Sequence, residues 1–328
     1  MLPVTIITRR AAVKAVAGWA ALLATRVGAL ATASQPSTRV NFSIPGGACD
    51  CHTHVFGDRS RYALWPRRTY TPEPASVAEM RTLHRALHMD RVVIVQPSIY
   101  GSDNSCTVDA MRELGAGARG VAVIDDETTD AQLDAMDRAG VRGIRLNLEA
   151  LGQTEPGAVR QRFLSAAARV QRRKWHIQIY TRLSVIESLR EQVSAAGIPI
   201  VFDHFGGARA SLGVDQPGFK ALLDLVRGGS AYVKISGAYR SSDKSPDYAD
   251  AAPLARGLIA ANAQRILWGT DWPHPNSVPP AGQAVDVVTP LFQIDDGRLL
   301  NQLAIWAPDA GVRKTILVDN PARLYGFP

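Results

Sequence analysis

The chain has 328 residues, of which 46% are hydrophobic and 20% are charged, a composition typical of a globular protein with a sizeable core. Its formal net charge of +7 falls to +3 without Arg9, Arg10, Lys14 and Arg26, which all lie in the N-terminal segment. Because the remaining charge is small and no basic patch is interleaved with aromatic residues, we expect no nucleic-acid partner.

Residues 1–33 are predicted to be an export signal. Arg9 and Arg10, with Lys14 four positions beyond the pair, resemble a twin-arginine motif, although the bulky apolar residue that usually follows the pair is missing. Charges interrupt the apolar stretch that follows, so we expect no stable membrane span in the mature form. The mature protein is expected to be periplasmic or secreted, passed by the twin-arginine export machinery, with residues 34–47 as a polar lead. An amphipathic or disordered start is the alternative.

Residues 48–328 are predicted to form a single domain of repeated βα units, because short apolar runs alternate with longer helical patterns. Eight strands are expected, at Ala48–Phe56, Arg91–Ser98, Gly120–Ile124, Gly143–Leu148, His176–Thr181, Pro199–His204, Ala231–Ser236 and Arg265–Thr270. Helical patterns include Ser76–His88, Val159–Arg173, Ser184–Ala196, Gly218–Val226 and Ala251–Ala261. Eight units fit a closed (β/α)8 TIM barrel. A doubly wound open sheet is the alternative, but the glycine-rich turn it needs after its first strand is missing.

Polar side chains gather where the expected strands end. His52 and His54 stand two positions apart on the first strand, so both imidazoles reach one point without a turn. Asp271 follows the last strand and His204 ends the sixth. Active sites of barrels lie at this end, so we expect these four side chains, called here the His–Asp cluster, to converge. Taken alone, His204 would be interpreted as structural.

Three cysteines are too few for a disulfide framework. Cys49 and Cys51 lie on either side of Asp50, and we expect them to face away from the histidines and to pack under helices. Cys106 has no obvious partner, which argues against a catalytic thiol.

Seven motifs give the chain a resemblance to the amidohydrolase superfamily. They are DCHTHVFG at Asp50–Gly57, RTYTP at Arg68–Pro72, GIRLNL at Gly143–Leu148, DHFG at Asp203–Gly206, KISGAYR at Lys234–Arg240, WGTDWPHPN at Trp268–Asn276 and NPARLYGF at Asn320–Phe327. Together they are similar to the branch that contains 2-pyrone-4,6-dicarboxylate lactonase and related sugar-lactone enzymes. The resemblance implies a hydrolase that opens a lactone or related cyclic ester bearing a carboxylate.

The expected mechanism follows from the types of group in the His–Asp cluster. Hydrolysis of a lactone needs a base for water and hydrogen-bond donors for the developing oxyanion. Asp271 is the expected base, ionised at neutral pH because cations surround it, and the three histidines are the expected donors.

The resemblance also implies five residues that contact the substrate. Forked guanidinium groups match planar carboxylates, and Arg145 and Arg240 stand near the ends of expected strands, where structural ion pairs are the alternative. Tyr70, Tyr180 and His274 would add further donors; the alternatives are that Tyr70 packs in a lid and that His274 braces a loop.

One departure from the lactonase pattern concerns the sixth strand. Gly207 stands where the lactonase has an arginine after its His-x-Gly, and the next basic residue is Arg209. The arginine clamp is therefore shifted or incomplete, which puts the pyrone dicarboxylate itself in doubt as substrate.

Metal-dependent members of the superfamily add further ligands to such a cluster. Here the fifth strand has Tyr180 at its mouth, and the fourth ends in Asn147 without a bridging lysine. We therefore expect metal-free chemistry, with a single zinc or other divalent ion on the His–Asp cluster as the alternative.

The sequence leaves three other functions open. They are a zinc-dependent hydrolase or decarboxylase of the superfamily, a sugar-lactone isomerase, and a non-catalytic periplasmic binding protein. A binding protein has no need of a positioned base, so an enzyme is the favoured interpretation.

Overall fold

The computed structural model describes residues 33–149 and 152–328. The predicted export signal lies outside the described residues except for Ala33, so it stays a prediction. In the described part of the chain, no helix combines the length and the apolar character needed to cross a membrane.

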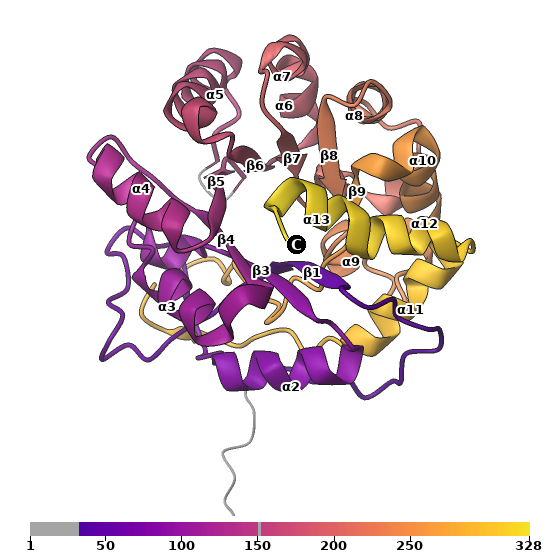
Figure 1. Cartoon of the computed structure of the whole chain (residues 1–328), viewed down its shortest axis with the longest axis horizontal. Helices are drawn as coiled ribbons and strands as arrows, with labels where there is room; N and C mark the ends of the chain where they lie inside the picture. The colour runs from indigo at the N-terminus through magenta and orange to yellow at the C-terminus, as the bar shows by residue number, and fades with distance from the viewer. Residues whose placement is uncertain (1–32, 150–151) are drawn as a thin grey trace, which may run out of the picture. The chain divides into compact units, whose positions relative to one another are not determined.

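Eight parallel strands form one sheet whose order follows the chain, and helices surround it (Figure 1). The strands are β1 Cys49–Thr53, β3 Arg91–Val95, β4 Ala118–Ala122, β5 Val141–Asn147, β6 His176–Tyr180, β7 Ile200–Phe202, β8 Ala231–Lys234 and β9 Ile266–Leu267. The ends of the sheet meet through backbone hydrogen bonds from Cys51 N to Trp268 O (3.0 Å) and from Asp271 N to His52 O (2.8 Å). The predicted (β/α)8 barrel is confirmed, and the alternative of an open doubly wound sheet was wrong.

The outer helices follow the strands as expected, with some differences in their ends. They are α2 Val77–Leu87, α3 Ser105–Leu114, α4 Asp130–Arg138, α5 Pro156–Val170, α6 Leu183–Ser188, α7 Arg190–Ala195, α8 Phe219–Arg227, α9 Ala238–Ser241, α10 Ala252–Asn262, α11 Asp296–Trp306, α12 Ala310–Lys314 and α13 Asn320–Tyr325. A capping box between Ser76 and Glu79 begins α2. The helix expected at Ser184–Ala196 is two helices, which meet at Leu189.

A β-bulge in β1 changes which side chains face the barrel interior. Asp50 pairs with Val92 and Thr53 with Ile94, so three steps along β1 match two along β3. The extra residue breaks the strict alternation of faces. As a result Cys51 lies in the interior apolar cluster, while the next residue, His52, still reaches the polar site.

The barrel interior below the site is apolar. Our expectation that Cys49 and Cys51 pack under the outer helices was wrong, because both belong to this interior cluster together with Val93 and Val201. The cluster also includes Tyr325 at the end of α13 and Phe327, and Figure 1 shows the C-terminus near the barrel axis. Cys49, Cys51 and Cys106 are all buried free thiols.

A second, small sheet pairs β2 Thr71–Pro72 with β10 Val288–Thr289. The Oγ1 of Thr71 also donates a hydrogen bond to Val285 O (2.6 Å). These contacts join the segment that carries Tyr70 to the loop that follows the last barrel strand.

Candidate active site

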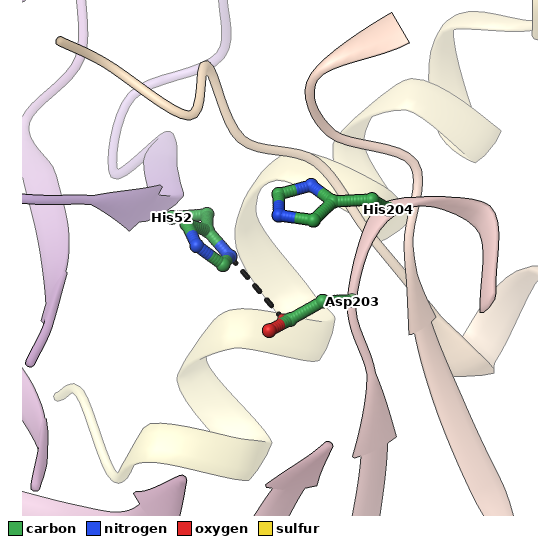
Figure 2. Close-up of side chains that lie close together, drawn as sticks. All are labelled: His52, Asp203 and His204. Atoms are coloured by element: carbon green, nitrogen blue, oxygen red, sulfur yellow. Dashed lines mark ion pairs between the residues drawn. The ribbon is translucent and has the colours of Figure 1, made fainter. Parts of the chain in front are cut away.

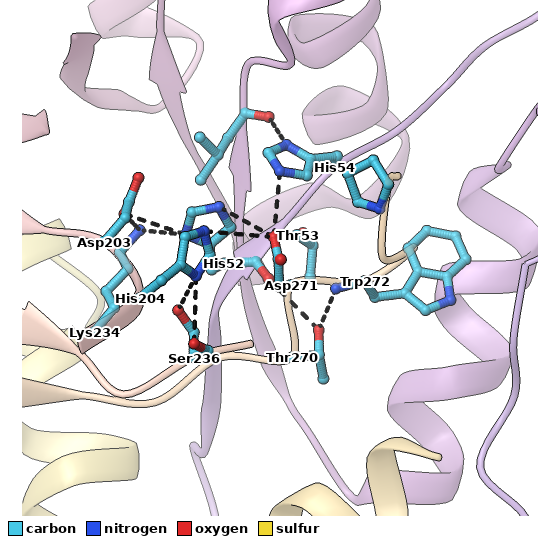
Figure 3. A network of polar contacts seen from close by, with 12 residues as sticks. His52, Thr53, His54, Asp203, His204, Lys234, Ser236, Thr270, Asp271 and Trp272 are labelled. Atoms are coloured by element: carbon cyan, nitrogen blue, oxygen red, sulfur yellow. Dashed lines mark hydrogen bonds and ion pairs between the residues drawn. The ribbon is translucent and has the colours of Figure 1, made fainter. Parts of the chain in front are cut away.

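The four members of the His–Asp cluster converge around one carboxylate oxygen. Oδ1 of Asp271 lies 3.6 Å from Nε2 of His52, 3.6 Å from Nε2 of His54 and 3.8 Å from Nε2 of His204. All four side chains are buried, and Figure 3 shows them meeting from β1, from the segment after β7 and from the segment after β9. The structure thus brings together the residues that the sequence singled out, while their catalytic roles stay predictions.

The backbone is shaped to deliver two of these side chains. Asp271 and His204 have φ angles of +68° and +48°, in a region that residues other than glycine seldom occupy and that often occurs at functional sites. Gly269 permits a close approach nearby, because an added Cβ would lie only 2.7 Å from His52 N.

Asp50 connects the first barrel strand to the segment after the last one, beneath the site. Its Oδ1 accepts hydrogen bonds from Thr270 N (3.0 Å) and His52 N (3.2 Å), and its Oδ2 accepts one from Thr270 Oγ1 (2.7 Å). Oδ2 also lies 3.2 Å from Nε2 of His84 on α2. The aspartate of the first motif therefore holds the two site-bearing segments in register.

The two oxygens of Asp271 have different surroundings. Oδ2 accepts a hydrogen bond from the Tyr239 hydroxyl (2.6 Å) and pairs with Nε of Arg240. Oδ1 has no hydrogen-bond partner among the described residues. Burial opposes ionisation, but Arg240 and then His204 outweigh it and hold the pKa of Asp271 well below its usual value. Asp271 is therefore a carboxylate whose free oxygen faces the histidines.

The three histidines are neutral at pH 7. Burial lowers the pKa of His54, lowers that of His52 well below its usual value, and brings that of His204 to about 4. The acidic neighbours Asp203 and Asp271 only partly oppose this effect.

The partner of each imidazole Nδ1 limits which ring nitrogen carries the proton. Nδ1 of His54 lies 2.8 Å from the carbonyl oxygen of Val95, which can only accept, so in the neutral ring Nε2 turns a lone pair toward Asp271. Nδ1 of His204 lies 3.0 Å from Oγ of Ser236, which can donate or accept, and 3.3 Å from the carbonyl oxygen of Ser236, which can only accept. His204 can therefore present either a lone pair or an N–H group to the site.

Asp203 and Lys234 form a buried pair that the sequence interpretation missed. Oδ1 of Asp203 lies 3.3 Å from Nδ1 of His52 (Figure 2) and 3.8 Å from Nζ of Lys234. Gln178 joins the two, since it accepts from Lys234 (2.6 Å) and donates to Oδ2 of Asp203 (3.1 Å). Burial would raise the pKa of Asp203, but His52 and Lys234 hold it far below its usual value. Asp203 is thus an ionised carboxylate beside the His52 ring, whose Nδ1 also lies 3.4 Å from Nζ of Lys234, a donor.

Arg145, Tyr180 and Arg240 lie around the His–Asp cluster, while their roles as substrate contacts stay predictions. Nε of Arg145, a buried side chain within β5, has no hydrogen-bond partner and lies 3.5 Å from Oδ2 of Asp203. The Tyr180 ring makes an edge contact with His204, with centroids 5.2 Å apart. Tyr180, His204 and Arg240 line a hollow of about 520 Å³, and Arg145 lines another of about 350 Å³.

Tyr70 and His274 are both buried and line neither hollow. Tyr70 lies near Ser98, Arg145 and Arg240, and burial raises its pKa to about 12. His274 is fully buried, with Nε2 2.9 Å from Oδ2 of Asp296. This pairing matches the alternative of a loop brace.

Three members of the His–Asp cluster, His52, His54 and Asp271, could hold a divalent cation, because one ligand atom of each lies within 4.8 Å of the other two. The Nε2 atoms of both histidines lie 3.6 Å from Oδ1 of Asp271, close to the spacing of roughly 3.4 Å expected between ligands of a tetrahedral zinc ion. Nε2 of His52 and Oδ1 of Asp271 are buried without hydrogen-bond partners. Tyr180 and Asn147 at the ends of β6 and β5 supply no ligand typical of zinc.

Sequence reasoning missed Asp203, Lys234, Gln178 and Tyr239. Lys234 ends the otherwise uncharged strand β8, and a charge in a strand buried on both faces requires a partner. That signal was available in the motif KISGAYR. Gln178 gave a weaker one, as a polar residue in the centre of β6.

The chain is similar to known lactone hydrolases. The chain is 36% identical over 293 residues to the 4-sulfomuconolactone hydrolase of Hydrogenophaga intermedia, covering 88% of this chain and 91% of the relative. It is 34% identical over 298 residues to the 2-pyrone-4,6-dicarboxylate hydrolase of Comamonas testosteroni, covering 88% and 93%. The crystal structure of an assigned 2-pyrone-4,6-dicarboxylic acid hydrolase from Pseudomonas putida superposes with a TM-score of 0.73 at 32% identity, covering 87% and 99%.

The family model described as "Amidohydrolase" matches residues 49–327, which is nearly the whole of the described barrel. The chain therefore belongs to the amidohydrolase family.

Proposed function

We propose that this enzyme hydrolyses a lactone that bears a carboxylate, with Asp271 as the general base. The observation that carries the proposal is the free Oδ1 of Asp271, which faces three imidazole nitrogens beside an arginine-lined hollow. Relatives named as lactone hydrolases, 34% to 36% identical over most of the chain, support the substrate class.

The reaction can be written with the groups present. Oδ1 of Asp271 accepts a proton from water while the water oxygen attacks the lactone carbonyl carbon. His204 donates from Nε2 to the developing oxyanion when the Ser236 hydroxyl donates to its Nδ1 (3.0 Å). Collapse of the intermediate breaks the ring C–O bond, and Asp271 returns its proton to the leaving oxygen. Arg145 and Arg240 hold the carboxylate of the substrate.

A panel of lactones tests this proposal by titration at constant pH. Hydrolysis of a lactone creates a new carboxylic acid and releases one proton at neutral pH, whereas isomerisation releases none. We expect proton release with carboxylated lactones. Turnover without proton release would point to an isomerase, and binding without any turnover would point to a binding protein.

A zinc-dependent form of the hydrolase is the second candidate. The observation that favours it is that Nε2 of His54 turns a lone pair toward Oδ1 of Asp271. Two acceptors then face each other, and a cation between them would bind to both. The His–Asp cluster would hold the ion, and zinc would supply Lewis-acid polarisation of the carbonyl or of water. The metal-free form remains our first proposal, since β5 and β6 add no ligand.

Metal content separates the two forms. For the metal-free form we expect far less than one equivalent of zinc in the purified protein and full activity after treatment with a chelator. Stoichiometric zinc, with activity that is lost on chelation and restored by zinc, would contradict the metal-free proposal.

Export stays part of the proposal on the strength of the N-terminal arginine pair alone. Fractionation of cells expressing the full chain tests it. We expect the processed protein in the periplasm or medium, and Arg9→Lys combined with Arg10→Lys should keep the precursor inside the cell.

A further inference from the structure

Residues 34–38, called here the strap, lie against the segment that carries Asp271. Nε1 of Trp272, the residue after Asp271, donates a hydrogen bond to the carbonyl oxygen of Ser34 (3.1 Å). Trp272 is fully buried and Ser34 is only 6% exposed, so bulk water does not compete for this contact. A segment that precedes the barrel in the sequence therefore contacts the neighbour of the proposed base.

Trp272 also connects the strap to the His–Asp cluster. Its backbone O accepts a hydrogen bond from His54 N (2.8 Å), and its backbone N donates one to Oγ1 of Thr270 (2.9 Å). The indole ring lies on the side of Asp271 away from the histidines (Figure 3). A displacement of this ring would therefore move Asp271 relative to His54.

The start of α11 holds both the strap and the loop that follows β9. Oδ2 of Asp295, the N-cap residue of this helix, accepts hydrogen bonds from Oγ of Ser37 (2.7 Å) and Oγ1 of Thr38 (2.6 Å). The next residue, Asp296, pairs with Nε2 of His274 in the loop (2.9 Å). One helix end thus fixes the strap and the loop relative to each other.

Gly297 shows how closely the strap packs against α11. An added Cβ would lie 1.8 Å from the carbonyl oxygen of Thr38 and 2.9 Å from its carbonyl carbon. Both are backbone atoms, so the strap would have to move away to make room for a side chain. Glycine is less favourable than alanine inside a helix, and the close approach of the strap explains its presence here.

We propose that the strap is a positioning element of the active site, which acts through Trp272 to hold Asp271 where it can activate water. The strap itself contacts no reacting group. This inference rests on the proposed lactone hydrolysis and adds to it a requirement for residues that precede the barrel. Loosening the strap should therefore lower kcat and change KM little, since it displaces the base and leaves the hollow beside it in place.

Two variants of the full-length protein loosen the strap. Gly297→Ala displaces Thr38, and Trp272→Phe keeps an aromatic ring but removes the N–H group that donates to Ser34. Hydrogen exchange followed by mass spectrometry should show roughly 10-fold faster exchange of residues 268–276 in both, the effect of about one lost hydrogen bond. We expect kcat to fall by roughly 10-fold in each, and no further in the double variant, because both changes break one contact.

Trp175→Phe and Asn301→Ala are the matched controls. Trp175 is also buried, and its Nε1 donates to Oδ1 of Asp137 (2.7 Å), away from the site. Asn301 on α11 binds Arg39 O (2.9 Å) and Asn41 N (2.8 Å), just beyond the strap. Both controls should leave kcat and the exchange of residues 268–276 unaltered.

Unchanged exchange of residues 268–276 in the two strap variants would overturn the inference. Faster exchange with an unaltered kcat, or losses in kcat that multiply in the double variant, would overturn it as well. If Gly297→Ala does not fold, Trp272→Phe alone decides. Failure of the proposed function shows separately, as absence of lactone turnover by the unsubstituted enzyme, and hydrogen exchange then still tells whether the strap holds the loop.

Discussion

The hydroxyl of Tyr239 is the single oxygen atom whose removal we expect to affect activity most. Its hydroxyl donates to Oδ2 of Asp271 (2.6 Å), the oxygen opposite the one that faces the histidines. Tyr239→Phe should lower kcat/KM by roughly 10-fold, because a hydrogen bond to a charged group contributes about 1.5 kcal/mol or more. Steady-state kinetics on a hydrolysed lactone measure the effect.

Tyr62→Phe is the control for this change. Tyr62 also donates to an aspartate, Asp109, at 2.9 Å, but away from the His–Asp cluster. Its substitution should leave kcat/KM unaltered. If both variants behave alike, Tyr239 does not act through Asp271.

Lys234 should matter for stability more than any exposed lysine. It is fully buried with Asp203 and Gln178, so Lys234→Met takes one of two cations, the other being Arg145, from a buried ionised carboxylate. Breaking a buried pair on one side typically lowers the free energy of unfolding by about 3 kcal/mol or more. Urea denaturation measures the loss.

The exposed pair of Lys220 and Asp224 provides the comparison. Lys220 is 87% exposed in the side chain, and Lys220→Met should cost less than about 1 kcal/mol. A loss of that small size for Lys234→Met would show that Arg145, His52 and Gln178 are enough to hold Asp203.

At the scale of elements, a buried histidine between β5 and β6 predicts that the folded protein loses stability in acid. His176 begins β6, with Nδ1 2.7 Å from the carbonyl oxygen of Arg142 on β5, and burial lowers its pKa from 6.5 to about 3. As the pH falls below 6.5, His176 is protonated in the unfolded chain before it is protonated in the folded protein. The free energy of unfolding therefore falls as the pH drops from 6.5 to 3, by up to ~1.4 kcal/mol per pH unit.

Thermal melting between pH 7 and pH 4.5 checks this expectation. His176→Gln should give a shallower decline of Tm with falling pH than the unsubstituted protein. His88→Gln, at an exposed position after α2, should leave the slope as it was. A slope unchanged by His176→Gln would contradict the assignment.

The elements also show what the sequence could and could not predict. Apolar periodicity was enough for eight βα units, because each strand is short and buried on both faces. The apolar pattern overestimated the length of β9, which is only Ile266–Leu267. The residues after β9 hydrogen-bond to β1 without forming a regular ladder. It also assigned Cys51 to the wrong face, because a bulge between Asp50 and Thr53 is a property of strand pairing.

At the scale of the described barrel, the polar site lies above an apolar interior that the C-terminal residues help to fill. The motifs predicted the convergence of His52, His54, His204 and Asp271, because parallel strands in a barrel end at one face. They did not predict how that group is supported. Asp203 follows β7 and Lys234 ends β8, so their pairing depends on tertiary structure.

The central claim is that Asp271 activates the attacking water, and Asp271→Asn tests it most directly. The amide preserves the shape of the side chain and removes the basic oxygen. On a lactone that the unsubstituted enzyme hydrolyses, we expect kcat to fall by about 10³-fold, while the lactone still binds to the folded variant. A kcat within tenfold of the unsubstituted enzyme would contradict the account.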